Sequence, residues 1–271
     1  MHLTRRKFKM TKKLNIFGAL ALSAMVLSAC GSDETSKTEE NGSEGTSEKK
    51  VLEMATSADF PPFESRDTEG NFEGFDIDLA NYIADELGYE LKIQDMKFDG
   101  LIGALQSDRI DMVLSGMSAT DDRKENVDFS LEYNRSGEMF ITLKDSEVKT
   151  LEDLEGLKVG VQLGTIQEDG AKKIQEDTVD FELKAVDNAN VLIQELLSNR
   201  IDVAYMDKAV AKGYIAEQDL AGFDDPTTSS PGMAVAFPKG SELVKEVNAV
   251  LEEAEESGKL QELKDKWLTE E

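Results

Sequence analysis

The residues that most enzymes use for nucleophilic and metal chemistry are almost absent from this chain. The only histidine is His2 and the only cysteine is Cys30, both near the N-terminus. The remaining chain therefore excludes Ser-His and Cys-His catalysis, the usual zinc sites and any disulfide. We expect no metal and no cofactor. Arginine, aspartate, serine, threonine and glutamine remain as the side chains from which a polar site can be built.

An internal repeat indicates where such side chains gather. Residues 101–113 recur as residues 192–204, with seven of thirteen positions identical at an offset of 91. Each copy has the pattern of an amphipathic helix followed by a short apolar strand at 110–114 or 201–205. A polar segment, 107–109 or 198–200, separates the two and is called the polar stop. In open α/β sheets the loops after the carboxyl ends of strands line the ligand crevice. The loops at 115–120 and 206–207 therefore predict two similar lobes that face each other across a cleft.

The segments around the repeat alternate between strand and helix patterns. Strands are predicted at 51–57, 89–93, 138–143, 157–162, 181–186 and 233–237, and helices at 76–87, 151–154, 165–176, 207–217, 241–256 and 259–268. The segment leading to Arg123 reads as a loop. If 233–237 returns to the first lobe, the chain crosses between lobes twice, near 135–141 and 229–235, which makes a hinge. The expected α/β fold has one lobe from 51–136 and 233–271 and a second from 137–232.

The N-terminus has the pattern of an export signal. Basic residues, with no acid, precede an apolar stretch at 16–27 that is too short to span a membrane. It ends in Leu-Ser-Ala-Cys30, which resembles the bacterial lipobox, where the cysteine becomes the lipidated first residue. We expect a signal peptide at 1–29, with translation starting at Met1 or, preferably, at Met10. Residues 31–50 contain no apolar side chain and predict a disordered linker after the lipidated Cys30.

The chain is strongly acidic, with 56 Asp and Glu against 30 Lys and Arg and a formal charge of −26. Such a charge argues against nucleic acid as a partner, because nucleic-acid affinity depends on neutralising phosphates. No segment after the signal is apolar enough to cross a membrane. We expect a monomer on the outer face of a Gram-positive cell membrane, which it contacts only through the lipid anchor.

With these residues laid out, the chain resembles the solute-binding proteins of the polar amino-acid uptake family, family 3, in its lipoprotein form. The resemblance covers 51–271 and is carried by Phe60-Pro-Pro-Phe63, Gly74-Phe-Asp-Ile-Asp-Leu79, Leu101 to Asp111, Gly116-Met-Ser-Ala-Thr120 with Arg123, Val127-Asp-Phe-Ser130, Val159-Gly-Val161 with Gly164-Thr165, and Ile201-Asp202 with Asp207. It implies a two-lobed, type II periplasmic-binding-protein-like fold. It also implies an ABC importer, with a membrane permease as partner, and no enzymatic activity.

The resemblance also implies the residues that hold an amino acid. Arg123 would clamp the α-carboxylate with its planar fork, and Asp207 would bind the ammonium. The other implied ligand-binding residues are Ser57, Phe60, Phe98, Ser115, Gly116, Ser118, Gln162, Thr165 and Ile166. Plainer interpretations exist: Arg123 as a solvated charge, Asp207 as a helix cap, and the two phenylalanines as core. Phe63 is assigned to the core, and Asp76 and Asp78 to a first helical turn, where acids complement the helix dipole.

The family pattern does not identify the ligand's side chain. Ser57 occupies the position at which some relatives have an acid that contacts this side chain. Loops near the expected cleft carry Asp59, Glu64, Asp76, Gln162 and Gln167, with Arg135 as the one basic exception. A distal cation would find partners there. We therefore expect a cationic ligand (arginine or lysine) or a neutral one (glutamine or cystine) rather than glutamate or aspartate.

Two other functions use the same fold. One is an amino-acid-sensing lipoprotein that signals through a partner. The other is an enzyme similar to cyclohexadienyl dehydratase, which would need an acid with a shifted pKa over the ligand. Glu64, Asp59 and Asp76 are the only candidates for this catalytic acid.

Overall fold

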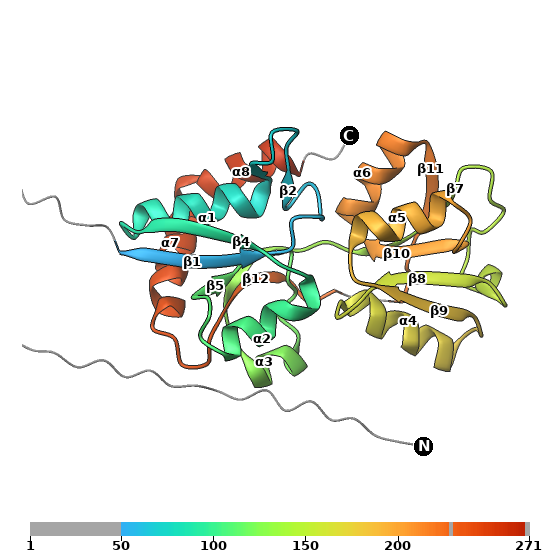
Figure 1. The fold of residues 1–271 in the computed structure, drawn as a ribbon, viewed down its shortest axis with the longest axis horizontal. Helices are drawn as coiled ribbons and strands as arrows, with labels where there is room; N and C mark the ends of the chain where they lie inside the picture. Colours follow the sequence, from blue (N-terminus) through green and yellow to red (C-terminus); the bar gives the residue numbers. More distant parts are fainter. Residues whose placement is uncertain (1–49, 228–229, 269–271) are drawn as a thin grey trace, which may run out of the picture. The chain divides into compact units, whose positions relative to one another are not determined.

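The computed structural model describes residues 50–227 and 230–268, which fold around two five-stranded sheets (Figure 1). The first sheet has the strand order β4-β1-β5-β12-β6. Its strands are β1 (Val51–Thr56), β4 (Glu90–Asp95), β5 (Met112–Val113), β6 (Asp128–Asn134) and β12 (Met233–Phe237). β1 lies parallel to β4 and β5, whereas β12 runs antiparallel to β5 and β6.

The second sheet has the strand order β11-β7-β10-β8-β9. Its strands are β7 (Glu138–Leu143), β8 (Lys158–Gln162), β9 (Glu182–Val186), β10 (Val203–Asp207) and β11 (Leu220–Asp224). β8 is parallel to β9 and β10, and β7 is antiparallel to β10 and β11. A small hairpin, β2 (Ser65–Arg66) with β3 (Phe72–Glu73), stands apart from both sheets. The prediction of an α/β fold with two lobes is confirmed.

Helices lie on both faces of each sheet (Figure 1). The first lobe has α1 (Phe75–Glu86), the 3₁₀ helix η1 (Phe98–Gly100), α2 (Leu101–Gln106), α3 (Asp121–Asn126), α7 (Leu243–Ser257) and α8 (Lys259–Trp267). The second lobe has η2 (Glu152–Leu154), α4 (Ile166–Asp177), α5 (Ala189–Leu197) and α6 (Lys208–Gln218). Apolar residues at helical spacing face the core, as Leu79 and Ile83 of α1 do.

The repeat forms matching parts of the two lobes. Its helices are α2 and α5, and its strands are β5 and β10, each the middle strand of its sheet. The polar stop also adopts the same conformation twice. Asp108 and Asn199, equivalent by the offset of 91, have left-handed φ angles of 51° and 55°. Asp and Asn are the non-glycine residues that tolerate this conformation best, so the two stops share a physical cause.

The chain passes between the sheets twice, from β6 to β7 and from β11 to β12. The first passage covers residues 135–137, and the second lies between Asp224 and Met233, with residues 228–229 outside the description. Both fall in the neighbourhood predicted for the hinge. The lobe boundaries at 136/137 and 232/233 stay a prediction.

One predicted assignment was wrong, and several elements were not predicted: strands β2, β3, β6 and β11 and the 3₁₀ helix η1. The segment before Asn126 is the short helix α3 rather than a loop, because the Thr120 hydroxyl accepts a hydrogen bond from the Arg123 N–H and caps it. Strand β11 was not predicted. Its sequence, Leu-Ala-Gly-Phe-Asp, has no clear alternation of apolar and polar residues and contains a glycine, which disfavours strands, so its pairing with β7 supplies the stability.

The predicted signal peptide at 1–29, the lipidated Cys30 and nearly all of the predicted linker lie outside the described residues. Within the described residues, no helix has both the length and the apolar character that crossing a membrane requires. The same part of the chain contains no group of three or more His, Cys, Asp or Glu arranged to hold a metal ion.

Candidate ligand-binding site

A small cavity collects most of the predicted site residues. It is lined by Asp59, Phe60, Phe98, Gly116, Ser118, Arg123, Gln162, Thr165, Ile166, Gln167, Asp207 and Met233. Every predicted ligand-binding residue is in this set except Ser57 and Ser115. The residues come from the ends of β8 and β10, the starts of α4, η1 and β12, helix α3, and the loops after β1 and β5. The cavity thus receives side chains from both lobes.

Arg123 is a buried cation that has no ion-pair partner in the described part of the chain, although the charge of Asp169 acts on it. It lies on α3 with its side chain packed over the Phe98 ring, 5.3 Å from the ring centroid. Its Nη1 donates to the Ser118 carbonyl and its Nη2 to the Gly164 carbonyl, both at 2.9 Å. Among the described residues, no carboxylate lies within ion-pair distance of it. Burial lowers the pKa of Arg123 to about 10, so the side chain stays charged at neutral pH. Such a guanidinium is suited to bind a carboxylate.

Asp207 is a buried acid at the carboxyl end of β10. It caps α6, with Oδ1 accepting from the N–H groups of Ala209 at 2.8 Å and Val210 at 3.4 Å. The Ser136 hydroxyl donates to the same oxygen at 3.0 Å. Burial raises the pKa of Asp207 to about 6, although these hydrogen bonds act against the rise. The two interpretations of Asp207, helix cap and wall of the cavity, hold together in the structure.

The N-terminus of α4 forms another wall of the cavity. Thr165 caps this helix by accepting from the Glu168 N–H, and its hydroxyl donates to the Gln162 carbonyl at 2.7 Å. The hydroxyl proton of Thr165 is therefore used within the protein. Ile166 and Gln167 occupy the first turn, where free N–H groups and the helix dipole favour an anion.

Gly116 and Phe60 pack closely on the first-lobe side. Gly116 has a left-handed φ of 54°, and a Cβ there would lie 3.2 Å from the Phe60 ring. Glycine therefore lets the turn after β5 approach the aromatic ring. Ser118 bridges to Met233 on β12, which brings the second crossing to the cavity edge.

Ser57 and Ser115 lie beneath the cavity rather than on its wall. The Ser115 hydroxyl accepts from the Ser57 N–H at 3.0 Å and donates to Glu64 at 2.9 Å. The Ser57 hydroxyl donates to Asp59 at 2.9 Å. Both side chains are buried and engaged within the protein, because β1 and β5 are neighbours whose ends meet at one edge. They connect the wall residues to the interior.

Asp59, Gln167 and Met233 line the cavity but were not among the predicted binding residues. The signal for Asp59 and Gln167 was present, since both were expected near the polar loops. The sequence pattern of residues 233–237 predicts a buried strand, and it gave no reason to separate Met233 from the core residues of that strand. Behind Gln167 lies Glu138, which accepts a hydrogen bond from the Gln167 amide. Burial and the charge of Asp207 raise the pKa of Glu138 to about 8.

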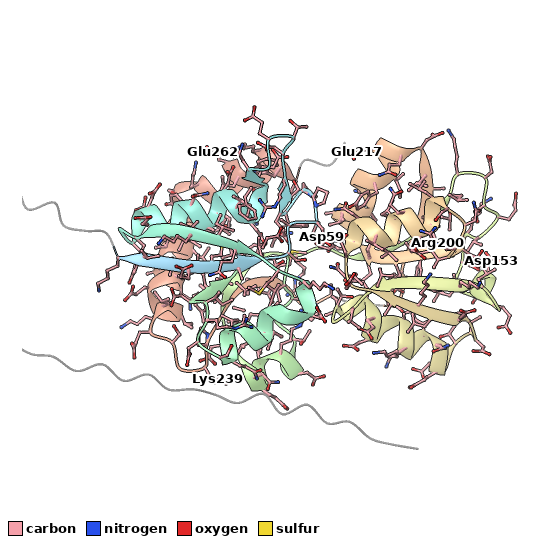
Figure 2. All side chains as sticks on the ribbon, viewed as in Figure 1. Asp59, Asp153, Arg200, Glu217, Lys239 and Glu262 are labelled. Atoms are coloured by element: carbon pink, nitrogen blue, oxygen red, sulfur yellow. The ribbon has the colours of Figure 1, made fainter. Side chains whose placement is uncertain are left out.

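Asp59 also joins the two lobes. Figure 2 shows it at the end of β1, on the side of the second lobe. Its Oδ2 accepts from the Ala189 N–H at the start of α5 at 2.7 Å and from the Gln162 amide at 3.5 Å. Lys97 and Asp187 form an ion pair between the same lobes. With the Arg123–Gly164 hydrogen bond, these contacts surround the cavity.

A larger groove of about 870 Å³ meets the cavity at three residues that line both, Phe98, Arg123 and Ile166. Its walls come from α3 and the loop before it on one side and from α4 on the other. The guanidinium of Arg123 therefore stands where the groove and the cavity join.

Comparison with known proteins gives concordant matches. Residues 52–270 match the family "bacterial extracellular solute-binding proteins, family 3". The arginine-binding extracellular protein ArtP of Bacillus subtilis (strain 168) is 42% identical over 261 residues, which are 95% of this chain and 98% of that protein.

Solved structures also resemble the chain. An ancestral arginine-binding protein bound to arginine matches with a TM-score of 0.77 and 39% identity, over 82% of this chain and all of that one. An ancestral amino acid-binding protein, described as a precursor of cyclohexadienyl dehydratase, matches with a TM-score of 0.75 and 35% identity, over 81% of this chain and 96% of that one.

Proposed function

The chain belongs to the bacterial extracellular solute-binding proteins of family 3, and we propose that it captures an amino acid with a cationic side chain for an ABC importer. In this proposal Arg123 binds the α-carboxylate together with the N-terminus of α4. Asp207 binds the ammonium. The ligand exchanges with the two carbonyls that Arg123 contacts in its absence, those of Ser118 and Gly164.

The charge balance of the cavity carries the choice of a cationic ligand. Its lining includes one cation, Arg123, and two carboxylates, Asp59 and Asp207. The two charged ends of any amino acid pair with Arg123 and Asp207, which leaves Asp59 without a cation. Burial raises the pKa of Asp59, as expected of a carboxylate that has lost water without gaining a positive partner. A guanidinium or ammonium on the ligand's side chain supplies that partner.

Arg135 does not change this balance. It pairs with Glu132 at 2.6 Å and donates to the Ser230 carbonyl at 2.7 Å, and it is not among the residues that line the cavity. A distal carboxylate on the ligand would therefore meet Asp59 with no basic side chain to offset the repulsion. This arrangement supports the preference against glutamate and aspartate.

Binding at both lobes explains how capture is signalled. We propose that lobe 1 consists of 51–136 and 233–271 and lobe 2 of 137–232, joined at the two passages between the sheets. A ligand held by Arg123 on one lobe and Asp207 on the other stabilises the closed arrangement and shifts the population toward it. The permease then recognises the closed, loaded form.

A thermal-shift screen of the twenty amino acids with ornithine, citrulline and cystine tests the proposal. Arginine or lysine should raise Tm by about 5–10 °C at about a hundred times its Kd. Ligand recovered after prolonged incubation should be chemically unchanged, because a binder performs no turnover. Stabilisation by glutamate or aspartate alone would overturn the cationic preference, and a consumed ligand would favour the enzyme.

Asp59→Asn should weaken arginine binding by about tenfold or more, because it removes the charge that faces the side-chain cation. The same change should alter citrulline binding by less than about threefold. Citrulline has nearly the shape of arginine but no distal charge, so it serves as the matched control. Calorimetry on both ligands measures the difference. An equal loss for both would show that Asp59 acts through the contact with Ala189 rather than through its charge.

We also propose that the mature protein is a lipoprotein attached through Cys30 to the outer face of the cell membrane. Cys30→Ser, or globomycin, should release the protein or leave it unprocessed, as seen by fractionation and mobility on gels. A linker shortened by ten residues is the control, and it should change neither retention nor ligand affinity. Normal membrane retention of a processed Cys30→Ser protein would contradict lipid anchoring.

A further inference from the structure

Two acids are buried together directly behind the cavity wall. Glu64 and Asp76 are both fully inaccessible to solvent. Asp76 Oδ2 accepts from the Gly116 N–H at 2.7 Å and from the Tyr133 hydroxyl at 2.8 Å. Glu64 Oε1 accepts from the Ser115 hydroxyl at 2.9 Å. The pair therefore holds both residues of the Ser115–Gly116 turn, and Gly116 is part of the cavity wall.

Each acid has one carboxyl oxygen without a hydrogen-bond partner among the described residues. These atoms, Glu64 Oε2 and Asp76 Oδ1, are both buried. Neither acid has a Lys or Arg within ion-pair distance in that part of the chain. Burial and the charge of Asp76 raise the pKa of Glu64 well above its usual range, and burial raises that of Asp76 to about 6. Two adjacent carboxyls in such a place cannot both be ionised.

We propose that Glu64 and Asp76 share one proton, so that the pair satisfies its own leftover oxygens and keeps a single buried negative charge behind the Gly116 wall of the cavity. The proton lies between Glu64 Oε2 and Asp76 Oδ1. One carboxyl is then the donor and the other the acceptor, which removes two unsatisfied buried groups at once. The remaining charge is delocalised over the two groups.

This pair acts on the ligand without touching it. Asp76 is one hydrogen bond from the Gly116 amide, so its charge stands one peptide unit behind the wall. There it attracts a positive group in the cavity through a medium of low polarity. The bonds to Ser115 and Gly116 also fix the turn beside Phe60. Glu64 and Asp76 are thus positioning residues. This part of the inference rests on the proposed function.

Amide variants separate the charge of the pair from its shape. In Glu64→Gln, the new amide donates to Asp76, which keeps the charge. In Asp76→Asn, the new amide donates to Glu64, which takes over the charge, while the Asn oxygen still accepts from Gly116 and Tyr133. Only the double variant loses the charge. Its two amide nitrogens also face each other without an acceptor between them, so the infrared test below separates loss of the shared proton from loss of this hydrogen bond. Asp78→Asn is the control, since Asp78 lies in the same helical turn but pairs with Lys266 and Trp267.

The expected pattern is non-additive. Each single change should weaken arginine binding by less than about twofold, and the double change by about tenfold or more, which exceeds the roughly fourfold product of the single losses. Asp78→Asn should bind like the unaltered protein. Losses in the double variant that equal the product of the single losses would overturn the shared charge.

Infrared spectroscopy of the ligand-free protein at neutral pH tests the proton itself. The difference spectrum between the unaltered protein and Glu64→Gln should show one lost band of a protonated carboxyl group. An unchanged carboxyl region would overturn the proposal, even where the double variant fails to fold. Because no ligand is present, a protein that bound no amino acid would refute the proposed function and leave this test intact.

Discussion

Arg123→Ala should weaken amino-acid binding by about a hundredfold or more while the protein stays folded. The guanidinium is buried, and no acid among the described residues lies within ion-pair distance of it, so its charge is available to a ligand carboxylate. Truncating one member of a buried charge pair typically costs binding in this range. Arg123→Lys should bind poorly as well, because an ammonium cannot reproduce a two-pronged contact. Calorimetry with arginine measures both losses.

Arg109→Ala is the matched control, because Arg109 is exposed and its guanidinium donates to the Ser107 hydroxyl at the surface. It should bind like the unaltered protein. Full affinity in Arg123→Ala or Arg123→Lys would remove Arg123 from the site and with it the proposed orientation of the ligand.

Asp207→Asn should cost about a hundredfold in affinity, again without unfolding. Asparagine is as good a helix cap as aspartate, so α6 keeps its N-terminal hydrogen bonds. What is lost is the charge that faces the ligand ammonium. Asp224→Asn is the control, since that acid pairs with Lys208 and is more than half exposed. Equal affinities in the two variants would show that Asp207 serves only as a cap.

The same acid predicts the pH dependence of binding. The pKa of Asp207 is raised to about 6 by burial, and the ligand ammonium binds the ionised form. The affinity of the unaltered protein should therefore be full above pH 7 and fall by nearly tenfold per pH unit well below pH 6. This fall should be much reduced in Asp207→Asn. A flat profile between pH 7 and pH 4.5 would contradict an ionised Asp207 as the ammonium partner.

The sequence predicted the two-lobe fold because its pattern is repeated and local. The helix–stop–strand units recur at 101 and 192 and place Asp108 and Asn199 in the same backbone conformation. The apolar periodicity of α1, α4, α5 and α7 matched the buried faces. Arg123 and Asp207 were named from the resemblance to the family. The structure places both side chains on the cavity wall, and their contacts with a ligand stay a prediction.

Features that depend on tertiary contacts were harder to predict from the sequence. Helix α3 depends on a capping hydroxyl three residues before Arg123, and β11 on pairing with β7. The placing of Ser57 and Ser115 below the cavity follows from how the ends of β1 and β5 meet. Asp76 was assigned to a helical first turn, where it does lie, but its complete burial against Gly116 and Tyr133 depends on the packing of α1 against the sheet.

A crystal structure of the protein with L-arginine tests the central claim most directly. The account predicts the α-carboxylate within hydrogen-bond distance of the Arg123 guanidinium and the ammonium within the same distance of Asp207, with the side-chain guanidinium toward Asp59. Arginine bound in the reverse direction, with its carboxylate away from Arg123, or bound outside the cavity between the lobes, would contradict it.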